Sequence, residues 1–179
     1  MLKTLFFTAV LGGSGIVFLS LGTAAKEKPA APRFSNPTAI TNKYLPLASL
    51  KEDILEGTED GKSIRVERTM KPGTKEFSIG GQTIQAAIME DREIIDGELE
   101  EVTLDYFAQA DDGTVYYLGE DVDNYKSGKV VAHEGAWLYG ANTKHLGTII
   151  TGNPTVGQKF RSEDVPRVTW EENTIESLS

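Results

Sequence analysis

The sequence contains no cysteine, which excludes disulfide bonds, cysteine zinc ligands, thiol catalysis and a lipid anchor attached to cysteine. Positive charge is also scarce, because 18 Lys and Arg residues stand against 27 Asp and Glu residues, for a formal net charge of -9. Proteins that bind nucleic acid need clustered positive charge, so we expect no nucleic-acid partner. The chain has 179 residues, which suits one domain of ordinary size.

Recognisable catalytic motifs are missing as well. The sequence has no G-x-S-x-G serine motif, no glycine-rich loop that leads to Lys-Ser or Lys-Thr, and no G-x-G-x-x-G motif. Only two histidines occur, His133 and His145, and Trp137 stands where an H-E-x-x-H zinc helix would need its second histidine. The sequence therefore singles out no catalytic, cofactor-binding or metal-binding residue, and we expect a protein that is not an enzyme.

One acidic segment deserves comparison with a calcium site. Residues 120–124 bring together Glu120, Asp121, Asp123 and Asn124 in an expected loop, and such oxygen ligands are those that Ca²⁺ prefers. The spacing does not match an EF-hand loop, and a solvated turn explains the same residues. The sequence leaves open whether Asp121 and Asp123 bind calcium.

The N-terminus has the pattern of an export signal. Lys3 precedes 18 uncharged residues that start at Thr4 and end at Leu21, and small residues follow up to Ala25. Two outcomes remain open: cleavage of a signal peptide over residues 1–25, or retention of residues 4–21 as one membrane anchor about 27 Å long. A retained helix would pack on other membrane helices through Ala9 and Gly13. Either outcome places the body outside the cytoplasm, in the periplasm or at the cell surface.

The rest of the chain divides into three parts by composition. A spacer rich in proline is expected first, because its composition favours extended backbone over a core. A β domain and a short acidic tail follow. The boundaries are 26–43 for the spacer, 44–170 for the domain and 171–179 for the tail.

The β domain is inferred from alternating apolar and polar residues and from glycine turns. Alternation marks three strands, and four glycine-containing turns separate strands along the chain. The expected strands are 64–70, 82–90 and 101–109, and the turns are 80–81, 96–97, 111–113 and 126–128. In the third strand, Val102, Leu104 and Tyr106 alternate with Thr103 and Asp105, which are assigned to the opposite, polar face. The pattern predicts an all-β antiparallel meander of roughly six to eight strands that closes into a barrel-like or sandwich domain.

Aromatic side chains gather in the middle of this domain. We interpret them as core, with an aromatic ligand cleft or a partner-facing patch as the alternative. They are Tyr106, Phe107, Tyr116, Tyr117, Tyr125, Trp137 and Tyr139.

Several short motifs resemble those of a group of exported bacterial β-rich proteins without a known activity. They are NKYLPL at 42–47, EGTEDG at 56–61, DYFAQ at 105–109, DGTVYYLGED at 112–121, GKVV at 128–131, EGAW at 134–137 and NPTVG at 153–157. The chain departs from the group at residues 48–55, where the group has a Pro-Gly turn and an aromatic strand. The resemblance implies an exported β protein and no specific activity.

Three functions are compatible with these observations. The first is a non-enzymatic interaction domain, such as an accessory subunit of a membrane-associated complex with a protein partner. The second is a carrier that holds a small apolar ligand in the concave face of the sheet, near Leu104, Tyr106 and Trp137, and that therefore needs a cavity of several hundred Å³. The third is an extracytoplasmic hydrolase, which needs a cleft where His133 or carboxylates converge.

Overall fold

The computed structural model describes residues 31–178, which form one unit that begins at Ala31. This unit is built from β-strands and one short 3-10 helix, so the prediction of an all-β antiparallel meander is confirmed. Within these residues no helix is long and apolar enough to cross a membrane. The export segment at residues 4–21 lies outside the described residues, and both of its expected outcomes stay predictions.

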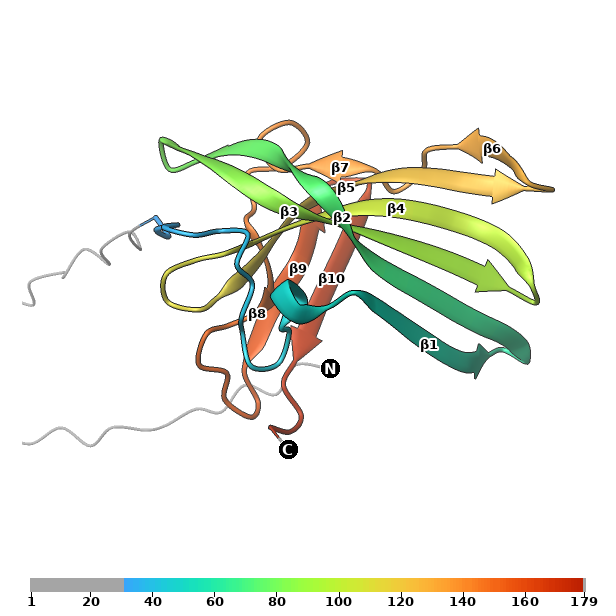
Figure 1. Cartoon of the computed structure of the whole chain (residues 1–179), viewed down its shortest axis with the longest axis horizontal. Coiled ribbons are helices and arrows are strands. Elements are labelled where there is room, and N and C mark those ends of the chain that lie inside the picture. Colours follow the sequence, from blue (N-terminus) through green and yellow to red (C-terminus); the bar gives the residue numbers. More distant parts are fainter. Residues whose placement is uncertain (1–30, 179) are drawn as a thin grey trace, which may run out of the picture. The chain divides into compact units, whose positions relative to one another are not determined.

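Six consecutive strands pair antiparallel in sequence order and make one curled sheet (Figure 1). The sheet has unpaired outer edges at β1 and β6, so it is a half-barrel and not a closed barrel. Two short strands, β7 and β8, also pair with β5, and β9 pairs with β10 in a separate hairpin. The bounds are η1 Leu47–Ser49, β1 Glu52–Glu59, β2 Lys62–Ile79, β3 Gln82–Ile95, β4 Glu98–Gln109, β5 Val115–Lys126, β6 Lys129–Ala132, β7 Trp137–Leu138, β8 Gly147–Ile150, β9 Lys159–Val165 and β10 Thr169–Thr174.

The turns are placed where the glycines predict them. Positive φ values occur at Gly80 and Gly81, at Asp96 and Gly97, and at Gly128, the conformations that connect twisted strands tightly. The strands that these turns connect are longer than the alternation indicated: β2 has 18 residues and β3 has 14. A bulge between Lys71 and Thr74 interrupts the alternation in β2, which hides its second half from a period-two search.

The inner face and one end of the outer face are covered, by different segments. The inner face packs on η1, β8 and β9 through a core cluster that includes Leu47, Met89, Phe107, Ile150 and Val165. The outer face has its own core over the ends of β2 to β5, formed by Phe77, Ile79, Ile84, Ala86, Tyr106, Ala108 and Leu118 and covered partly by Phe34, Leu138, Tyr139 and Leu146. The expected division into one dry and one wet face is therefore wrong.

The aromatic residues are divided between these two cores. Tyr106, Phe107, Tyr117 and Trp137 are buried, which confirms the core interpretation for these four. Phe107 and Tyr117 stack with their ring centroids 5.0 Å apart, and Trp137 meets Tyr117 edge-on at 5.3 Å. Tyr116, Tyr125 and Tyr139 are half-buried.

The described part of the expected spacer lies against the β domain. Ile40 is fully buried, and the Pro37 carbonyl accepts a hydrogen bond of 2.8 Å from the Gln109 amide. A second backbone bond of 2.8 Å joins the Asp111 amide to the Arg33 carbonyl. Backbone hydrogen bonds from the end of β4 and from the β4–β5 loop thus hold this segment in place. The composition of the segment did not indicate such contacts. At the other end, the first residues of the expected acidic tail belong to β10.

The segment that departs from the family resemblance forms η1 and the first half of β1. The Leu47 carbonyl accepts a bond of 3.0 Å from the Leu50 amide, and Ala48 bonds to the Ile40 carbonyl at 2.9 Å. These contacts set Leu47 into the inner core, where it is 5% exposed. A helical turn thus stands where a Pro-Gly turn was expected.

Candidate functional site

A cavity of about 400 Å³ lies on the inner face of the sheet. Strands β1 to β5 line one side of it, and η1 with its flanks, β8 and the β9–β10 hairpin line the other. The lining residues fall into an apolar set and an acidic set. They are Leu45, Leu47, Leu50, Val66, Met89, Phe107, Tyr117 and Ile149, then Asp53, Asp91, Glu93, Glu101, Asp105, Glu120, Glu163 and Glu171, with Arg68 and Thr103 in addition.

The apolar wall of the cavity is continuous with the inner core. Met89 and Phe107 belong to that core and project from β3 and β4, while Leu45 and Leu50 pack on it from either side of η1. The core below therefore holds these side chains in place. Such a wall can bury the apolar body of a small molecule.

The acidic lining has a single basic residue among it. Eight carboxylates and one guanidinium line the cavity, and the guanidinium is taken by an ion pair in which Arg68 Nε lies 2.9 Å from Asp91 Oδ2. Burial, with further effects from neighbouring carboxylates, raises the pKa of Glu93 and of Glu101. Like charges that share a partly desolvated site disfavour ionisation in this way.

Asp105 is the most enclosed of these carboxylates, because only 6% of the residue is exposed. The Tyr117 hydroxyl donates to its Oδ1 at 2.6 Å, and the Thr103 hydroxyl donates to its Oδ2 at 3.2 Å. Burial raises the pKa of Asp105 to about 6, although the hydrogen bond from Tyr117 works in the opposite direction. The pKa of this buried carboxyl group therefore lies within about one unit of neutral pH.

Glu120 lies on the same face as Tyr117 because of a bulge in β5. Gly119 has a φ of 126°, and the register between β4 and β5 shifts at this point. A Cβ atom on Gly119 would lie 2.2 Å from the Trp137 carbonyl oxygen, so β7 approaches β5 only at a glycine. The bulge brings two residues three positions apart in the sequence to one face.

The environment of Glu120 strongly favours its neutral form. Burial is the largest cause, and the negative charges of Asp105 and Glu163 add to it, so that the pKa of Glu120 rises to about 8. The nearby Tyr117 hydroxyl lowers the pKa by less. Within the described residues no Lys, Arg or His side chain pairs with Glu120.

The β9–β10 hairpin fixes the two carboxylates that it contributes. Glu163 accepts a hydrogen bond from Trp137 Nε1 at 3.3 Å and another from the Thr169 hydroxyl. Glu171 accepts from the buried Ser162 hydroxyl at 2.5 Å. The donors are neutral, and neither Glu163 nor Glu171 has an ion-pair partner in the part of the chain that the structure describes.

The segment considered for calcium does not form a loop. Residues 120–124 belong to β5, so their side chains alternate between faces: Glu120 lines the inner cavity, whereas Asp121 and Asp123 lie on the outer face. There Lys75 Nζ lies 2.8 Å from Asp121, and His133 Nδ1 lies 2.9 Å from Asp123. The expectation of a loop was wrong. In residues 31–178 no group of three or more His, Cys, Asp and Glu side chains is arranged to hold a metal ion.

The other residues considered from the sequence lie outside the cavity. His133 Nδ1 is 2.7 Å from the Val122 carbonyl oxygen, and His145 Nε2 is 3.3 Å from the Arg161 carbonyl oxygen. Leu104 and Tyr106 belong to the outer face, and Trp137 is buried behind Tyr117. The expected carrier residues are therefore wrong, because the concave lining comes from the alternate positions of β4.

Sequence reasoning missed both central carboxylates. Asp105 was assigned to a polar, wet face, yet it lies with Thr103 and Phe107 on the inner face, and all three are buried. Phe107 lies two positions after Asp105 and therefore on the same face of β4. This large apolar residue was the sequence signal that the face is covered. Glu120 was grouped with Asp121, although strand alternation places them on opposite faces, and the bulge at Gly119 decides that Glu120 is the one that faces inward.

No family model, no curated protein and no solved structure matches the chain. Its function is therefore argued from the geometry of the described residues.

Proposed function

We propose that the protein is a non-enzymatic binding protein that holds a small organic molecule with an apolar body in the inner cavity. The observation that carries the proposal is a cavity of about 400 Å³ with an apolar wall on the inner face of a curled sheet. Sites for small molecules commonly enclose roughly 300–1,000 Å³ and combine apolar walls with a few polar groups. An interaction domain without a ligand has no need of such a cavity.

The proposal includes a location outside the cytoplasm, as the export segment at residues 4–21 predicts. If that segment is retained, the binding domain is tethered to the membrane and can deliver its ligand to, or receive it from, a protein partner there. If the segment is removed, the protein is a free carrier. The binding site is the same in both cases, because it is built within residues 31–178.

Methionine methyl groups provide the test. Of the three methionines, Met89 lines the cavity, so its ¹³C-labelled methyl resonance reports occupancy. We expect it to shift in a saturable way with at least one of three eight-carbon amphiphiles, whose head groups are positive, neutral or negative. If none of the three moves the resonance at millimolar concentration, the proposed function is wrong.

A pair of valine variants locates the binding. Val66 lines the cavity, whereas Val131 is 60% exposed on β6. Val66→Trp fills part of the cavity and is expected to weaken binding at least tenfold. Val131→Trp makes the same chemical change away from the cavity and is expected to leave binding unchanged. Equal effects of the two variants would place the ligand elsewhere.

A further inference from the structure

The buried carboxylate of Asp105 lines the cavity and forms no ion pair within the described residues, although the charge of Arg68 lowers its pKa a little. Its two hydrogen-bond donors, the hydroxyls of Tyr117 and Thr103, are neutral. Arg68 forms its ion pair with Asp91 instead, and within the described residues no other cation pairs with Asp105. Buried charges in proteins are normally paired, so an unpaired one at the wall of a cavity points to a charge that the ligand brings.

The groups next to Asp105 can accept hydrogen bonds from a ligand. Tyr117 uses its one hydroxyl hydrogen on Asp105 and therefore offers only lone pairs to a ligand. Glu120, on the same face three residues along β5, adds a second carboxyl group, and no Lys, Arg or His among residues 31–178 forms an ion pair with it. A ligand group that donates several hydrogen bonds and carries positive charge matches this set of acceptors.

A metal ion does not meet the same requirement. The described residues contain no group of three or more suitable side chains in a metal-binding arrangement. A hard metal ion binds oxygen ligands and gains nothing from contact with the apolar wall of leucines, Met89 and Phe107. An organic cation needs charge on one side and apolar contact on the other, and the cavity supplies both.

We propose that the ligand is an amphipathic organic cation, an alkylammonium, whose ammonium group lies against Asp105, Tyr117 and Glu120 and whose aliphatic chain lies on the wall of Met89 and Phe107. This inference rests on the proposed function and names the chemical class of its ligand. The ammonium group donates three hydrogen bonds, and the carboxyl oxygens and the Tyr117 hydroxyl accept them. The chain replaces water on the apolar side of the cavity.

Three probes with one alkyl chain separate charge from apolar contact. We would titrate the full-length protein with octylammonium, 1-octanol and octanoate by calorimetry at pH 7.5. We expect octylammonium to bind at least tenfold more tightly than 1-octanol, and octanoate to bind more weakly than either. Equal affinity for 1-octanol and octylammonium, or tighter binding of octanoate, would overturn the cation inference and leave the proposed function standing. Absence of binding by all three would overturn both.

Carboxylate variants assign the preference to the named residues. Glu120→Gln and Asp105→Asn are each expected to reduce the preference for octylammonium over 1-octanol about tenfold, while the affinity for 1-octanol stays within a factor of three. Glu67→Gln is the matched control, because it removes one carboxylate from the outer face, where Glu67 pairs with Arg65 at 2.8 Å. If the control reduces the preference as much as the two inner variants do, net charge and not this site selects the cation.

Proton release gives a readout that a merely structural role for Glu120 would not produce. Glu120 is faced by Asp105 and Glu101 from β4 and by Glu163 from β9, and its pKa of about 8 leaves it mainly protonated at pH 7. A bound ammonium group favours the carboxylate, so binding is expected to release a substantial fraction of one proton. Calorimetry in two buffers of different ionisation enthalpy measures this number. We expect Glu120→Gln to remove most of the release; unchanged release in that variant would contradict the placement of the ammonium group beside Glu120.

Discussion

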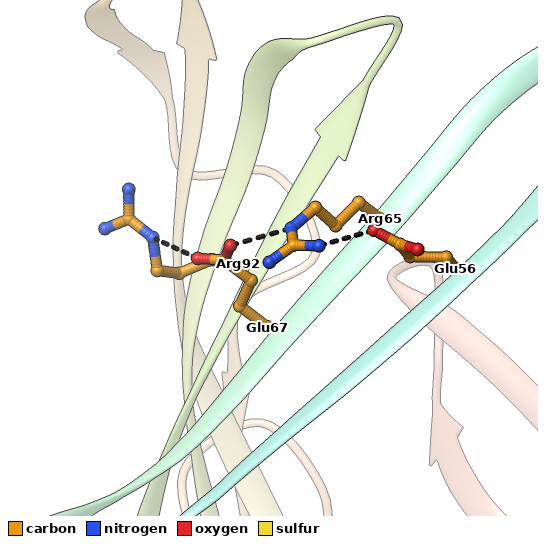
Figure 2. A network of polar contacts seen from close by, with 4 residues as sticks. All are labelled: Glu56, Arg65, Glu67 and Arg92. Carbon is orange, nitrogen blue, oxygen red and sulfur yellow. Dashed lines mark hydrogen bonds and ion pairs between the residues drawn. The ribbon is translucent and has the colours of Figure 1, made fainter.

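The two faces of the sheet differ in how their charged side chains are arranged. On the outer face, Glu56, Arg65, Glu67 and Arg92 alternate in sign across β1, β2 and β3 and form a continuous chain of ion pairs (Figure 2). The successive N···O distances are 2.5, 2.8 and 3.9 Å. On the inner face, eight carboxylates line one cavity with a single arginine. Strands β1 to β3 contribute residues to both sets, and β4, β5, β9 and β10 supply the other inner carboxylates.

This difference separates charges that serve solubility from charges that can serve binding. Exposed ion pairs contribute roughly 0–1 kcal/mol each, so the outer chain adds little to stability and exerts little net field. The inner carboxylates are partly desolvated and repel one another, which raises the pKa of Asp105 to about 6 and that of Glu120 to about 8. A fold that keeps such destabilising groups together has them available for a partner charge.

Substitution at the bulge that places Glu120 in the inner cavity is expected to have the largest effect on stability. Gly119→Ala places a Cβ atom 2.2 Å from the Trp137 carbonyl oxygen at a φ of 126°. We expect a loss of more than about 3 kcal/mol in the free energy of unfolding, measured by urea denaturation. Gly97→Ala is the control, since Gly97 also has a positive φ, 84°, but no atom within 4 Å of the added Cβ. It should cost only roughly 1–2 kcal/mol, and a similar loss in both variants would show that β7 yields to the side chain.

The wild-type protein is expected to lose stability as the pH rises from 5 to 8.5. Asp105 and Glu120 have folded-state pKa values of about 6 and about 8, above their ordinary values of 3.8 and 4.5. The folded state therefore binds protons more tightly, and its stabilisation is lost as the pH rises through those values. We expect a decrease on the order of 2 kcal/mol, or several degrees in Tm. Calorimetric melting at a series of pH values checks the sign.

Glu120→Gln is expected to stabilise the protein at high pH. The variant cannot ionise, so it avoids the cost that the wild-type carboxylate carries, which grows as the pH rises from the ordinary value of 4.5 to the folded-state pKa of about 8. At pH 8.5 the gain should be about 1 kcal/mol, a few degrees in Tm. At pH 4 the two proteins should melt close together, because Glu120 is then largely protonated in the folded and the unfolded state alike. A lower Tm for the variant at both pH values would mean that the charge of Glu120 stabilises the fold.

A Glu→Gln substitution on the outer face is expected to lower the stability, the opposite of its effect at Glu120, and to have the smallest effect of the four predictions. Glu67→Gln removes the carboxylate that lies 2.8 Å from Arg65 Nε and 3.9 Å from Arg92 Nε. We expect a loss of about 0.5 kcal/mol at low ionic strength and less at 1 M salt, where exposed ion pairs are screened. Thermal melts of wild type and variant at the two salt concentrations test this. A gain in stability would remove the distinction between the faces.

Much of the fold followed from the sequence, because its signals are local. Glycine pairs and Asp-Gly placed the turns at 80–81 and 96–97, and alternation found parts of β2, β3 and β4. The site was harder to predict. Asp105 looked like a solvent-facing residue in a half-buried strand, and the covering of that face by η1 and by the β9–β10 hairpin depends on contacts between distant segments.

The sequence by itself determined the β class, the positions of the main turns, the acidic balance and the exclusion of cysteine chemistry, because composition and short-range backbone preference decide these properties. Tertiary structure decided which face each carboxylate occupies. The bulge at Gly119 turns Glu120 toward Asp105, and β7 pairs with β5 at that bulge, where only a glycine fits. Convergence of like charges on one cavity depends on strand register and on the segments that cover the sheet, and neither is encoded within any short stretch of the chain.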